Sequence, residues 1–210
     1  LDNSSIPYNH NSLNDNDIRG AERSVINLIL RLNKLGHKIT LLNNTNINVN
    51  FENIRSINIH NYNENTNYDL AITNNDLNNF KYIKSTKKVA ISHSVQTIEK
   101  FIRKNQLFSY LKYKPKIFLL GKYHKSKRNY FTRIFGHEII NWAVDDDFIN
   151  SKLTNNIDHM KALFTSYPDR NLDKLVSIWT KYIFTQNDKL KLYTTPTPKN
   201  RKEFNIFNRK

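Results

Sequence analysis

The stretch from residue 17 to residue 42 most constrains what this chain can fold into. Apolar residues recur at steps of three and four between Val25 and Leu35, which predicts a helix with one apolar face. Gly36 follows the last of them, where a helix end favours a residue that tolerates positive φ. Residues 38–42 predict a short strand. A loop, a helix and a strand in this order are half of a parallel α/β unit, so we expect an α/β fold.

The loop before this helix is a candidate ligand site. Gly20 has no side chain, so a ligand can approach its backbone closely. The first N–H groups of a helix lack internal partners and favour an anion. The chain has only four glycines, so a glycine here is less expected by chance. The alternative is a glycine that merely eases the turn into the helix.

The segment IRGAERSVINLILRLNKLGHKITLL resembles the opening of the family 4 glycosyltransferases, which have the GT-B fold of two Rossmann-type domains. The family pattern is a Gly-Gly-x-Glu loop, a helix and a Gly-His turn into the second strand. Gly20, Glu22, Gly36 and His37 match it, whereas Arg19 replaces the first glycine. The resemblance implies that Gly20 and Glu22 bind the donor or the acceptor.

The composition restricts the partners and the compartment. A net charge of +15 favours an acidic partner, namely phosphate, nucleic acid or an anionic membrane, or else a solubilising surface. The absence of cysteine excludes disulfides and thiolate metal sites and fits a reducing cytosol. No run approaches the roughly twenty apolar residues of a membrane span. We expect a cytoplasmic protein, with peripheral binding to the inner membrane face as an option.

Further strands are predicted along the chain at residues 51–59, 68–73, 89–91 and 117–120. Only a short polar segment separates the first two, so the usual crossover helix is shrunken or missing there. Residues 77–83 predict a short helix, and the Asn-rich stretches 43–50 and 61–67 predict polar loops.

His93 stands just after the predicted strand 89–91. A histidine at the carboxyl end of a parallel strand can donate a hydrogen bond to a ligand or polarise it. The alternative is a histidine satisfied within the core or at the surface. VAISHS resembles the family strand whose terminal histidine faces the reaction centre, which implies a catalytic role for His93. His10, in the loop of residues 3–18, is expected at the surface.

Residues 100–133 are strongly basic and contain interleaved aromatic residues. Such a segment can bind single-stranded nucleic acid or an anionic membrane surface. Some of the aromatic residues are expected in the core instead. No RNA-binding signature accompanies the charge, and the glycosyltransferase interpretation involves no nucleic acid. The basic residues are Lys100, Arg103, Lys104, Lys112, Lys114, Lys116, Lys122, Lys125, Lys127, Arg128 and Arg133.

Residues 138–148 predict a strand that runs into the acidic turn 145–147. Three consecutive aspartates point to alternating sides of an extended chain and make a poor metal cage, so we expect no metal there. The stretch resembles the family's linker strand. The resemblance implies a first, acceptor-side domain over residues 1–150, followed by a linker and the beginning of a nucleotide-sugar-binding domain over residues 151–210.

A second β-loop-α-β unit is predicted from Leu163 to Tyr193. An Arg beside a helix start can bind a phosphate through two hydrogen bonds, or it can simply be a surface residue that caps its own helix. SYPDRNLDKLVSIW resembles the family loop whose cations hold the nucleotide diphosphate. Arg170 falls on its Lys position and Asn171 on its Gly, which implies donor binding by both.

The resemblance as a whole implies a glycosyltransferase of the hexosyltransferase type that acts in cell-envelope polysaccharide synthesis. Such an enzyme moves a sugar from a nucleotide-sugar donor to a glycan or lipid-linked acceptor, with retention and without a metal or another cofactor. Leu1–Ser4 looks like the end of a first strand, and the family's later Glu-containing donor motif has no counterpart. We therefore expect a fragment that is inactive alone. The alternative function is a non-catalytic basic module for nucleic acid or anionic membrane.

Overall fold

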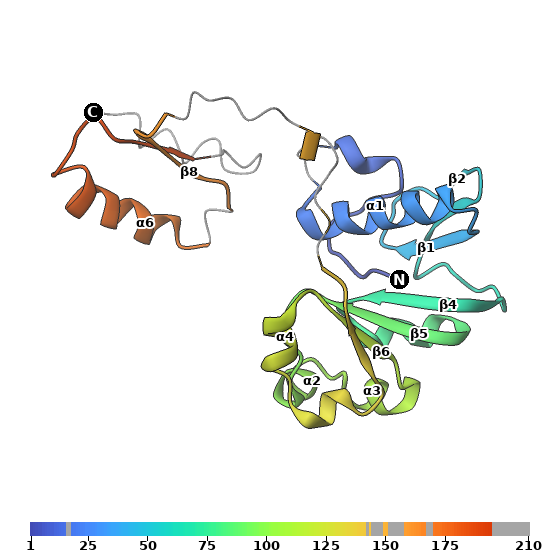
Figure 1. Ribbon diagram of the computed structural model, residues 1–210. Coiled ribbons are helices and arrows are strands. Elements are labelled where there is room, and N and C mark those ends of the chain that lie inside the picture. The colour runs from blue at the N-terminus through green and yellow to red at the C-terminus, as the bar shows by residue number, and fades with distance from the viewer. Residues whose placement is uncertain (16–17, 142, 144–148, 151–157, 167–169, 195–210) are drawn as a thin grey trace. The chain divides into compact units, whose positions relative to one another are not determined.

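The computed structural model describes residues 1–15, 18–141, 143, 149–150, 158–166 and 170–194. The chain divides into two compact units, Leu1–Ala143 and Val144–Lys210 (Figure 1). The sequence placed this boundary at about residue 150, and the predicted acidic turn 145–147 lies outside the described residues. Each unit is considered by itself below.

The helix and strand predicted near the start of the first unit are confirmed. Helix α1 spans Gly20–Lys34 and strand β1 spans Ile39–Asn43. Gly36 joins them with a φ of +88°, the left-handed conformation that glycine adopts without steric cost. The apolar face of the helix buries Ile26 and Ile29 against the sheet. A short 3₁₀ helix, η1 (Ser12–Asn14), lies in the loop before α1.

Strand β1 belongs to a three-stranded sheet. It pairs in parallel with β3 (Ile54–Asn58), and β3 pairs antiparallel with β2 (Val49–Phe51). The strand predicted over residues 51–59 is confirmed for Ile54–Asn58, but its first residue, Phe51, belongs to β2 because the chain turns at Glu52, whose φ is +50°. That turn creates a hairpin that local alternation did not predict.

The second sheet has four parallel strands in the order of the sequence. They are β4 (Asn67–Asn74), β5 (Lys84–Ser92), β6 (Lys116–Leu119) and β7 (His137–Ile139). No helix links β3 to β4, as predicted, and the short helix predicted over residues 77–83 is the 3₁₀ helix η2 (Leu77–Tyr82). Strand β5 begins five residues earlier than predicted, at Lys84.

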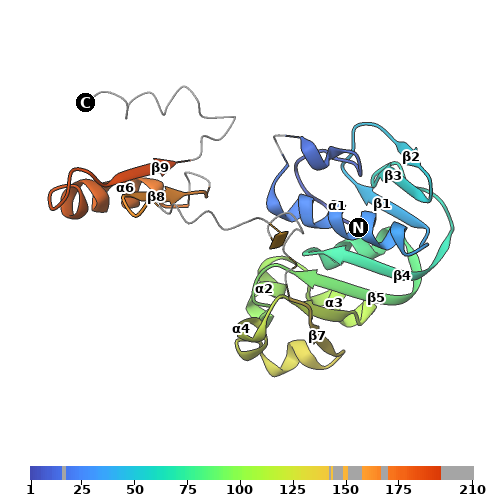
Figure 2. The ribbon, with the colours of Figure 1, turned by 45° about the horizontal axis from the view of Figure 1, so that its top comes forward.

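Leu1 and Asp2 join the two sheets. Asp2 forms a parallel bridge with Asn74 and donates its backbone N–H to the carbonyl of Leu42 at 2.9 Å. Asn74 donates its backbone N–H to the carbonyl of Leu1 at 2.9 Å. Leu1–Asp2 therefore lies between β1 and β4 (Figure 2). The chain then forms the β1-β3-β2 sheet on one side of this segment and later the β4-β5-β6-β7 sheet on the other. This mixed α/β fold with a parallel sheet is compatible with a Rossmann-like arrangement, with the strand order reversing at Leu1–Asp2.

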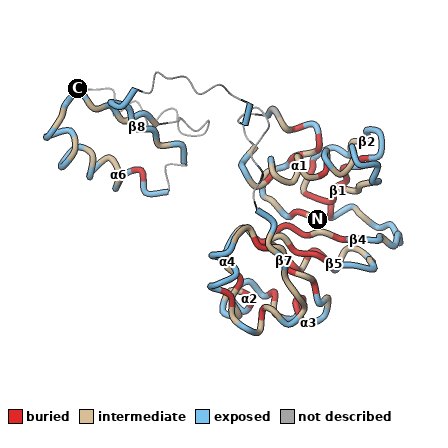
Figure 3. Tube along the Cα trace, in the orientation of Figure 1, coloured by how far each residue is buried: buried red, intermediate tan, exposed pale blue. Residues whose placement is uncertain are grey.

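Both faces of the sheet are buried, as is usual for parallel strands. On β1, Leu41 belongs to the core under α1 and Leu42 belongs to a core that includes Ile83. Figure 3 shows buried residues along β1, β4 and β5. Side chains at successive positions of β1 therefore enter different cores.

A group of short helices follows the strands of the second sheet, namely α2 (Ile98–Arg103), α3 (Leu107–Tyr113), α4 (Lys122–Ser126) and η3 (Tyr130–Arg133). Phe101 and Tyr110 lie in the core with ring centroids 4.8 Å apart, so part of the aromatic content of segment 100–133 is structural, as predicted. Arg128 is also buried, with an exposed fraction of 4%. Its interpretation as a surface cation is wrong, because α4 and η3 turn this side chain inward.

The second unit contains the predicted β-loop-α-β pattern. Strands β8 (Lys161–Phe164) and β9 (Lys191–Thr194) pair in parallel. Helix α6 (Leu172–Ile178) lies between them in the sequence and continues as the π-helical turn η4 (Trp179–Ile183). Among the described residues of both units, no helix is long and apolar enough to cross a membrane.

Candidate functional site

Polar side chains gather where the strand order reverses, at the carboxyl end of the parallel strands. Asp2 lies in the bridging segment, Asn74 ends β4, and His93 directly follows β5. Glu22 approaches from the first turn of α1. Ligands of open parallel sheets bind at this kind of position, so we treat these residues as the candidate site.

Asp2, Asn74 and His93 are linked by hydrogen bonds through their side chains. Asn74 Nδ2 donates to Asp2 Oδ1 at 3.2 Å, and His93 Nε2 lies 2.7 Å from Asn74 Oδ1. An amide oxygen only accepts, so Nε2 is the nitrogen that carries the proton. In the neutral imidazole, the lone pair is then on Nδ1. The backbone N–H of His93 also donates to Asn75 Oδ1 at 3.0 Å, which further fixes the residue.

Tyr8 holds the other oxygen of the Asp2 carboxylate. The Tyr8 hydroxyl donates to Asp2 Oδ2 at 2.5 Å, and Asn43 Nδ2 donates to the Tyr8 carbonyl at 2.6 Å. Asp2 is 4% exposed, and its burial raises the pKa of this carboxyl above the usual 3.8. Burial also raises the pKa of the Tyr8 hydroxyl, which therefore stays protonated and remains a donor.

Glu22 is a buried acid with unused hydrogen-bonding capacity. Its exposed fraction is 5%, Ser4 donates a hydroxyl hydrogen bond to its Oε1, and its Oε2 has no partner among the described residues. A buried carboxylate oxygen is costly to leave unpaired. Glu22 can therefore accept a hydrogen bond from a hydroxyl-bearing ligand.

The environment of His93 keeps its ring neutral at pH 7. Burial is the largest cause that lowers the pKa of His93. The nearby carboxylates of Asp2 and Glu22 oppose this, and electrostatic interactions with His124 and Lys100 lower the pKa further. The pKa of His93 is therefore lower than the ordinary 6.5. Lys100 comes from α2 and donates to Ser94 Oγ at 2.5 Å, so a cation lies near the same edge of the sheet.

The predicted site residues have different outcomes. The structure brings Glu22 and His93 into one electrostatic neighbourhood, at the edge of the sheet where α1 begins. Gly20 is the first residue of α1 and is exposed, and a Cβ built on it would meet nothing within 4 Å. Packing thus does not require glycine there, and its role in binding a ligand stays a prediction.

Arg170 and Asn171 lie in the second unit. Both are exposed, and Asn171 has a φ of +66°. Its carbonyl accepts the backbone N–H of Leu175 at 3.0 Å in the first turn of α6. The left-handed conformation agrees with the glycine of the resembled loop, since Asn adopts it more readily than most residues. Donor binding by this pair stays a prediction.

His10 is not the surface residue that its loop position suggested. It is 2% exposed, and its Nδ1 lies 2.7 Å from Ser56 Oγ on β3. The described part of this loop places His10 beside β3, among buried side chains. Among the described residues, no group of three His, Cys, Asp or Glu side chains could hold a metal ion.

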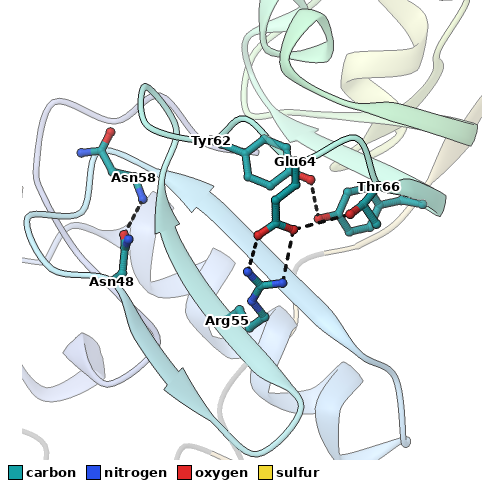
Figure 4. Close-up of polar contacts among 7 residues, drawn as sticks. Asn48, Arg55, Asn58, Tyr62, Glu64 and Thr66 are labelled. Carbon is teal, nitrogen blue, oxygen red and sulfur yellow. Dashed lines mark hydrogen bonds and ion pairs between the residues drawn. The ribbon is translucent and has the colours of Figure 1, made fainter.

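A second polar cluster holds the Asn-rich segment 61–67 against β3 (Figure 4). Arg55 donates to both carboxylate oxygens of Glu64, at 3.3 and 2.5 Å, and the hydroxyls of Tyr62 and Tyr68 are 2.9 Å apart. Burial raises the pKa of Tyr62 to about 12. A cleft of about 210 Å³ lies beside this cluster. These contacts connect β3 to β4 in place of a crossover helix.

The sequence interpretation missed Asp2, Tyr8 and Asn74. Asn74 carried a usable signal, because it is a polar residue at the carboxyl end of an apolar strand, whereas no apolar run in the sequence marks Asp2. Tyr8 carried none, since it lies in a polar loop. Comparison with known proteins found no matching family profile, no similar curated protein and no similar solved structure.

Proposed function

We propose that this chain is part of a glycosyltransferase and that its first unit binds the acceptor. The observation that carries the proposal is the linked set of Asp2, Asn74 and His93, with Glu22 beside it, at the point where the strand order reverses. Carboxylate oxygens and a neutral imidazole suit a ligand that is rich in hydroxyl groups. A sugar has this chemistry.

The reaction breaks the bond between the anomeric carbon and the diphosphate of a nucleotide sugar and forms a bond to an acceptor oxygen. The acceptor hydroxyl gives up its proton to the phosphate oxygen that leaves with the nucleotide. Glu22 Oε2 is available to accept a hydrogen bond from a hydroxyl of the acceptor. His93, held through Nε2, contacts the transferred sugar with its other side and helps to orient it.

The second unit supplies the donor side in this proposal. Arg170 and the backbone at Asn171 hold the diphosphate of the leaving nucleotide, whose negative charge grows as the bond breaks. The transfer proceeds with retention and without a metal, as the family resemblance implies. A GT-B arrangement of two domains belongs to the proposal as well.

Isothermal titration with a panel of nucleoside diphosphates, nucleotide sugars and neutral oligosaccharides tests this function. Saturable binding that is selective for one sugar nucleotide, or for a neutral glycan, is the expected result. Binding of any polyanion with a steep salt dependence, and of nothing else, would contradict it.

A membrane-binding role is the second candidate, supported by exposed aromatic residues among lysines. Phe108, Tyr123 and Tyr130 are 74%, 66% and 84% exposed. Lys127 lies 6.0 Å from the centroid of the Tyr123 ring. Aromatic rings and lysines together suit the interface of an anionic bilayer. This role is compatible with transfer to a lipid-linked acceptor.

A further inference from the structure

Arg128 is a buried cation that leaves most of its hydrogen-bonding capacity unused. The residue is 4% exposed, and its Nε donates to Thr132 Oγ1 at 3.2 Å. Neither Nη1 nor Nη2 has a partner among the described residues. These two nitrogens carry four of the five N–H groups of a guanidinium, in the fork that binds two oxygens of an anion. The anion-binding end of Arg128 is therefore available to a ligand.

Arg133, the last residue of η3, brings a second guanidinium close to the first. Its Nη2 donates to the backbone carbonyls of Lys125 and Arg128, both at 3.1 Å. Its Nε is buried and has no partner in the described part of the chain. Positive charge extends around the pair, since burial, Arg128 and Lys125 lower the pKa of His137. Two guanidinium groups and a lysine thus act on one small region.

This part of the chain supplies no carboxylate to balance the two arginines. The sequence holds neither Asp nor Glu between Glu99 and Glu138, and Glu138 forms an ion pair with Lys116. Burial, together with the nearby Arg133, lowers the pKa of Arg128 to about 10, so the guanidinium is still charged at pH 7. Water can supply hydrogen bonds to such a group but cannot neutralise it. A buried charge without a counter-charge is costly, so an anion from outside the chain would stabilise this arrangement.

The number of donors selects the kind of anion. A carboxylate has two oxygens and a single charge, so it matches one guanidinium. A phosphate monoester has about −1.5 to −2 charges at pH 7 and three accepting oxygens. Two of these oxygens can accept from Nη1 and Nη2 of Arg128, and the third can accept from Nε of Arg133. In number and in charge, a phosphate group therefore fits the two arginines better than a carboxylate does.

We propose that Arg128 and Arg133 bind a phosphate group between α4 and η3, carried either by a small phosphorylated ligand or by the headgroup of an anionic lipid. Both sources present the same tetrahedral anion. The site belongs to the first unit and shares no residue with the proposed donor position at Arg170 and Asn171. The inference therefore does not rest on the proposed transferase activity.

The anion reaches this site by displacing helix α4. The unpartnered nitrogens of Arg128 and Arg133 are covered by protein atoms. Helix α4 has five residues, none of them buried, and its Lys125 carbonyl accepts from Arg133 Nη2. Moving α4 aside therefore exposes little apolar surface. It also lets this donor exchange a neutral carbonyl for a charged phosphate oxygen, which is the stronger acceptor.

Isothermal titration of the whole chain with inorganic phosphate, at constant ionic strength, tests the site. We expect saturable binding of a single phosphate by the parent. Arg128→Met should bind it at least about tenfold more weakly, because the variant keeps the length of the side chain and loses the fork. Arg133→Gln keeps an amide donor for the carbonyls of Lys125 and Arg128 and should also weaken binding. Lys127→Met, which changes an exposed neighbour, should bind phosphate as the parent does.

Thermal unfolding gives an independent readout of the same site. A ligand that binds only the folded chain raises the unfolding midpoint as its concentration rises. Phosphate also stabilises proteins by exclusion from their surface, and that effect should be equal in the parent and in Arg128→Met. We expect the midpoint to rise more in the parent. An absence of saturable binding, or equal affinities and midpoint shifts in the parent, Arg128→Met and Arg133→Gln, would overturn the proposal.

Vesicles distinguish the two sources of the phosphate group. Phosphatidic acid exposes a phosphate monoester, whereas phosphatidylserine at the same total charge does not. Stronger binding of the parent to vesicles with phosphatidic acid, lost in Arg128→Met, supports a lipid headgroup at the site. Equal binding to both kinds of vesicle, with inorganic phosphate still bound in the titration, supports a small phosphorylated ligand.

Discussion

His93 Nε2 donates a hydrogen bond to Asn74 Oδ1 across 2.7 Å, which ties the end of β5 to the end of β4. Asn74 is oriented in turn by Asp2, whose carboxylate accepts from its Nδ2. The orientation of the imidazole is thus fixed before any ligand binds. Preorganised groups of this kind lose little freedom when a substrate arrives.

The first prediction concerns the protonation of His93. Because burial lowers the pKa of this ring, we expect it to titrate below 6.5 and to carry its neutral proton on Nε2. Nitrogen-edited NMR of the histidine rings measures both properties. Asn74→Asp should raise the pKa of His93, because it places a carboxylate beside Nε2. A ring that carries its proton on Nδ1 would contradict the assignment.

The second prediction concerns Asp2 and pH. Burial raises the pKa of Asp2 in the folded chain above the 3.8 of the unfolded chain. At pH values between the pKa of Asp2 in the unfolded chain and its pKa in the folded chain, the folded state binds more protons than the unfolded state. This carboxyl therefore makes the free energy of unfolding fall as pH rises through that window. Asp2→Asn removes this pH dependence. The free energy of unfolding of the variant, relative to that of the parent, should therefore rise with pH across that window. Urea unfolding at a series of pH values measures this, and parallel curves for the two proteins would refute it.

The third prediction concerns the buried cation Arg128. Its two Nη atoms have no partner among the described residues, and burial lowers the pKa of the guanidinium to about 10. Replacing an uncompensated buried charge by an apolar side chain of similar length removes a desolvation cost. We expect Arg128→Met to raise the free energy of unfolding by about 1 kcal/mol or more. Thr132, which now accepts from Arg128 Nε, keeps its hydrogen bond to Asn129.

Lys127→Met is the matched control for that substitution, because Lys127 is adjacent and exposed. Its effect on the free energy of unfolding should stay within about 0.5 kcal/mol. Chemical denaturation of the three proteins gives the comparison. Loss of stability in Arg128→Met would indicate that the guanidinium is compensated in solution.

The fourth prediction concerns membrane binding. We expect the protein to cosediment with anionic liposomes at low salt and to be released as salt rises, because each lysine near the surface contributes about 1 kcal/mol. Replacing the exposed residues Lys122, Lys125 and Lys127 by Gln should weaken this binding. Arg128 is left unchanged because it is buried.

The control for this experiment changes the same charge elsewhere. Lys81, Lys84 and Lys87 are exposed and lie before or within the first half of β5, away from its carboxyl end. Their replacement by Gln should leave liposome binding largely intact. Equal losses in both triple variants would mean that net charge alone drives the association, and a parent that remains in the supernatant would rule out the membrane role.

The fifth prediction concerns turnover, once titration has identified a donor. If His93 contacts the transferred sugar, His93→Ala in the full-length enzyme should lower kcat by about 100-fold while changing donor affinity little. Glu22→Gln should chiefly raise the KM for the acceptor, because it removes a charged hydrogen-bond acceptor without changing the shape of the side chain. Unchanged kinetics in His93→Ala would return this histidine to a structural role.

The sequence was sufficient for features that depend on neighbouring residues. The spacing of Ile26 and Ile29 predicted the buried face of α1, and Gly36 predicted the left-handed turn after it. His93 was recognised because it follows an apolar strand. Helical periodicity and positive φ are encoded within a few residues, so they can be read locally.

Only the tertiary structure decided which of these segments meet. The bridge between Asp2 and Asn74 joins residues that are far apart in the chain, and it creates the hydrogen bonds that fix His93. The burial of Arg128 and His10 was equally unpredictable, since their neighbours come from other elements. Local periodicity specifies a strand and its faces, whereas the order of strands in a sheet depends on long-range pairing and packing. The sequence by itself therefore determined the helices and strands and the strand ends at which polar residues lie. The fold determined which residues these polar groups contact and which charge they carry.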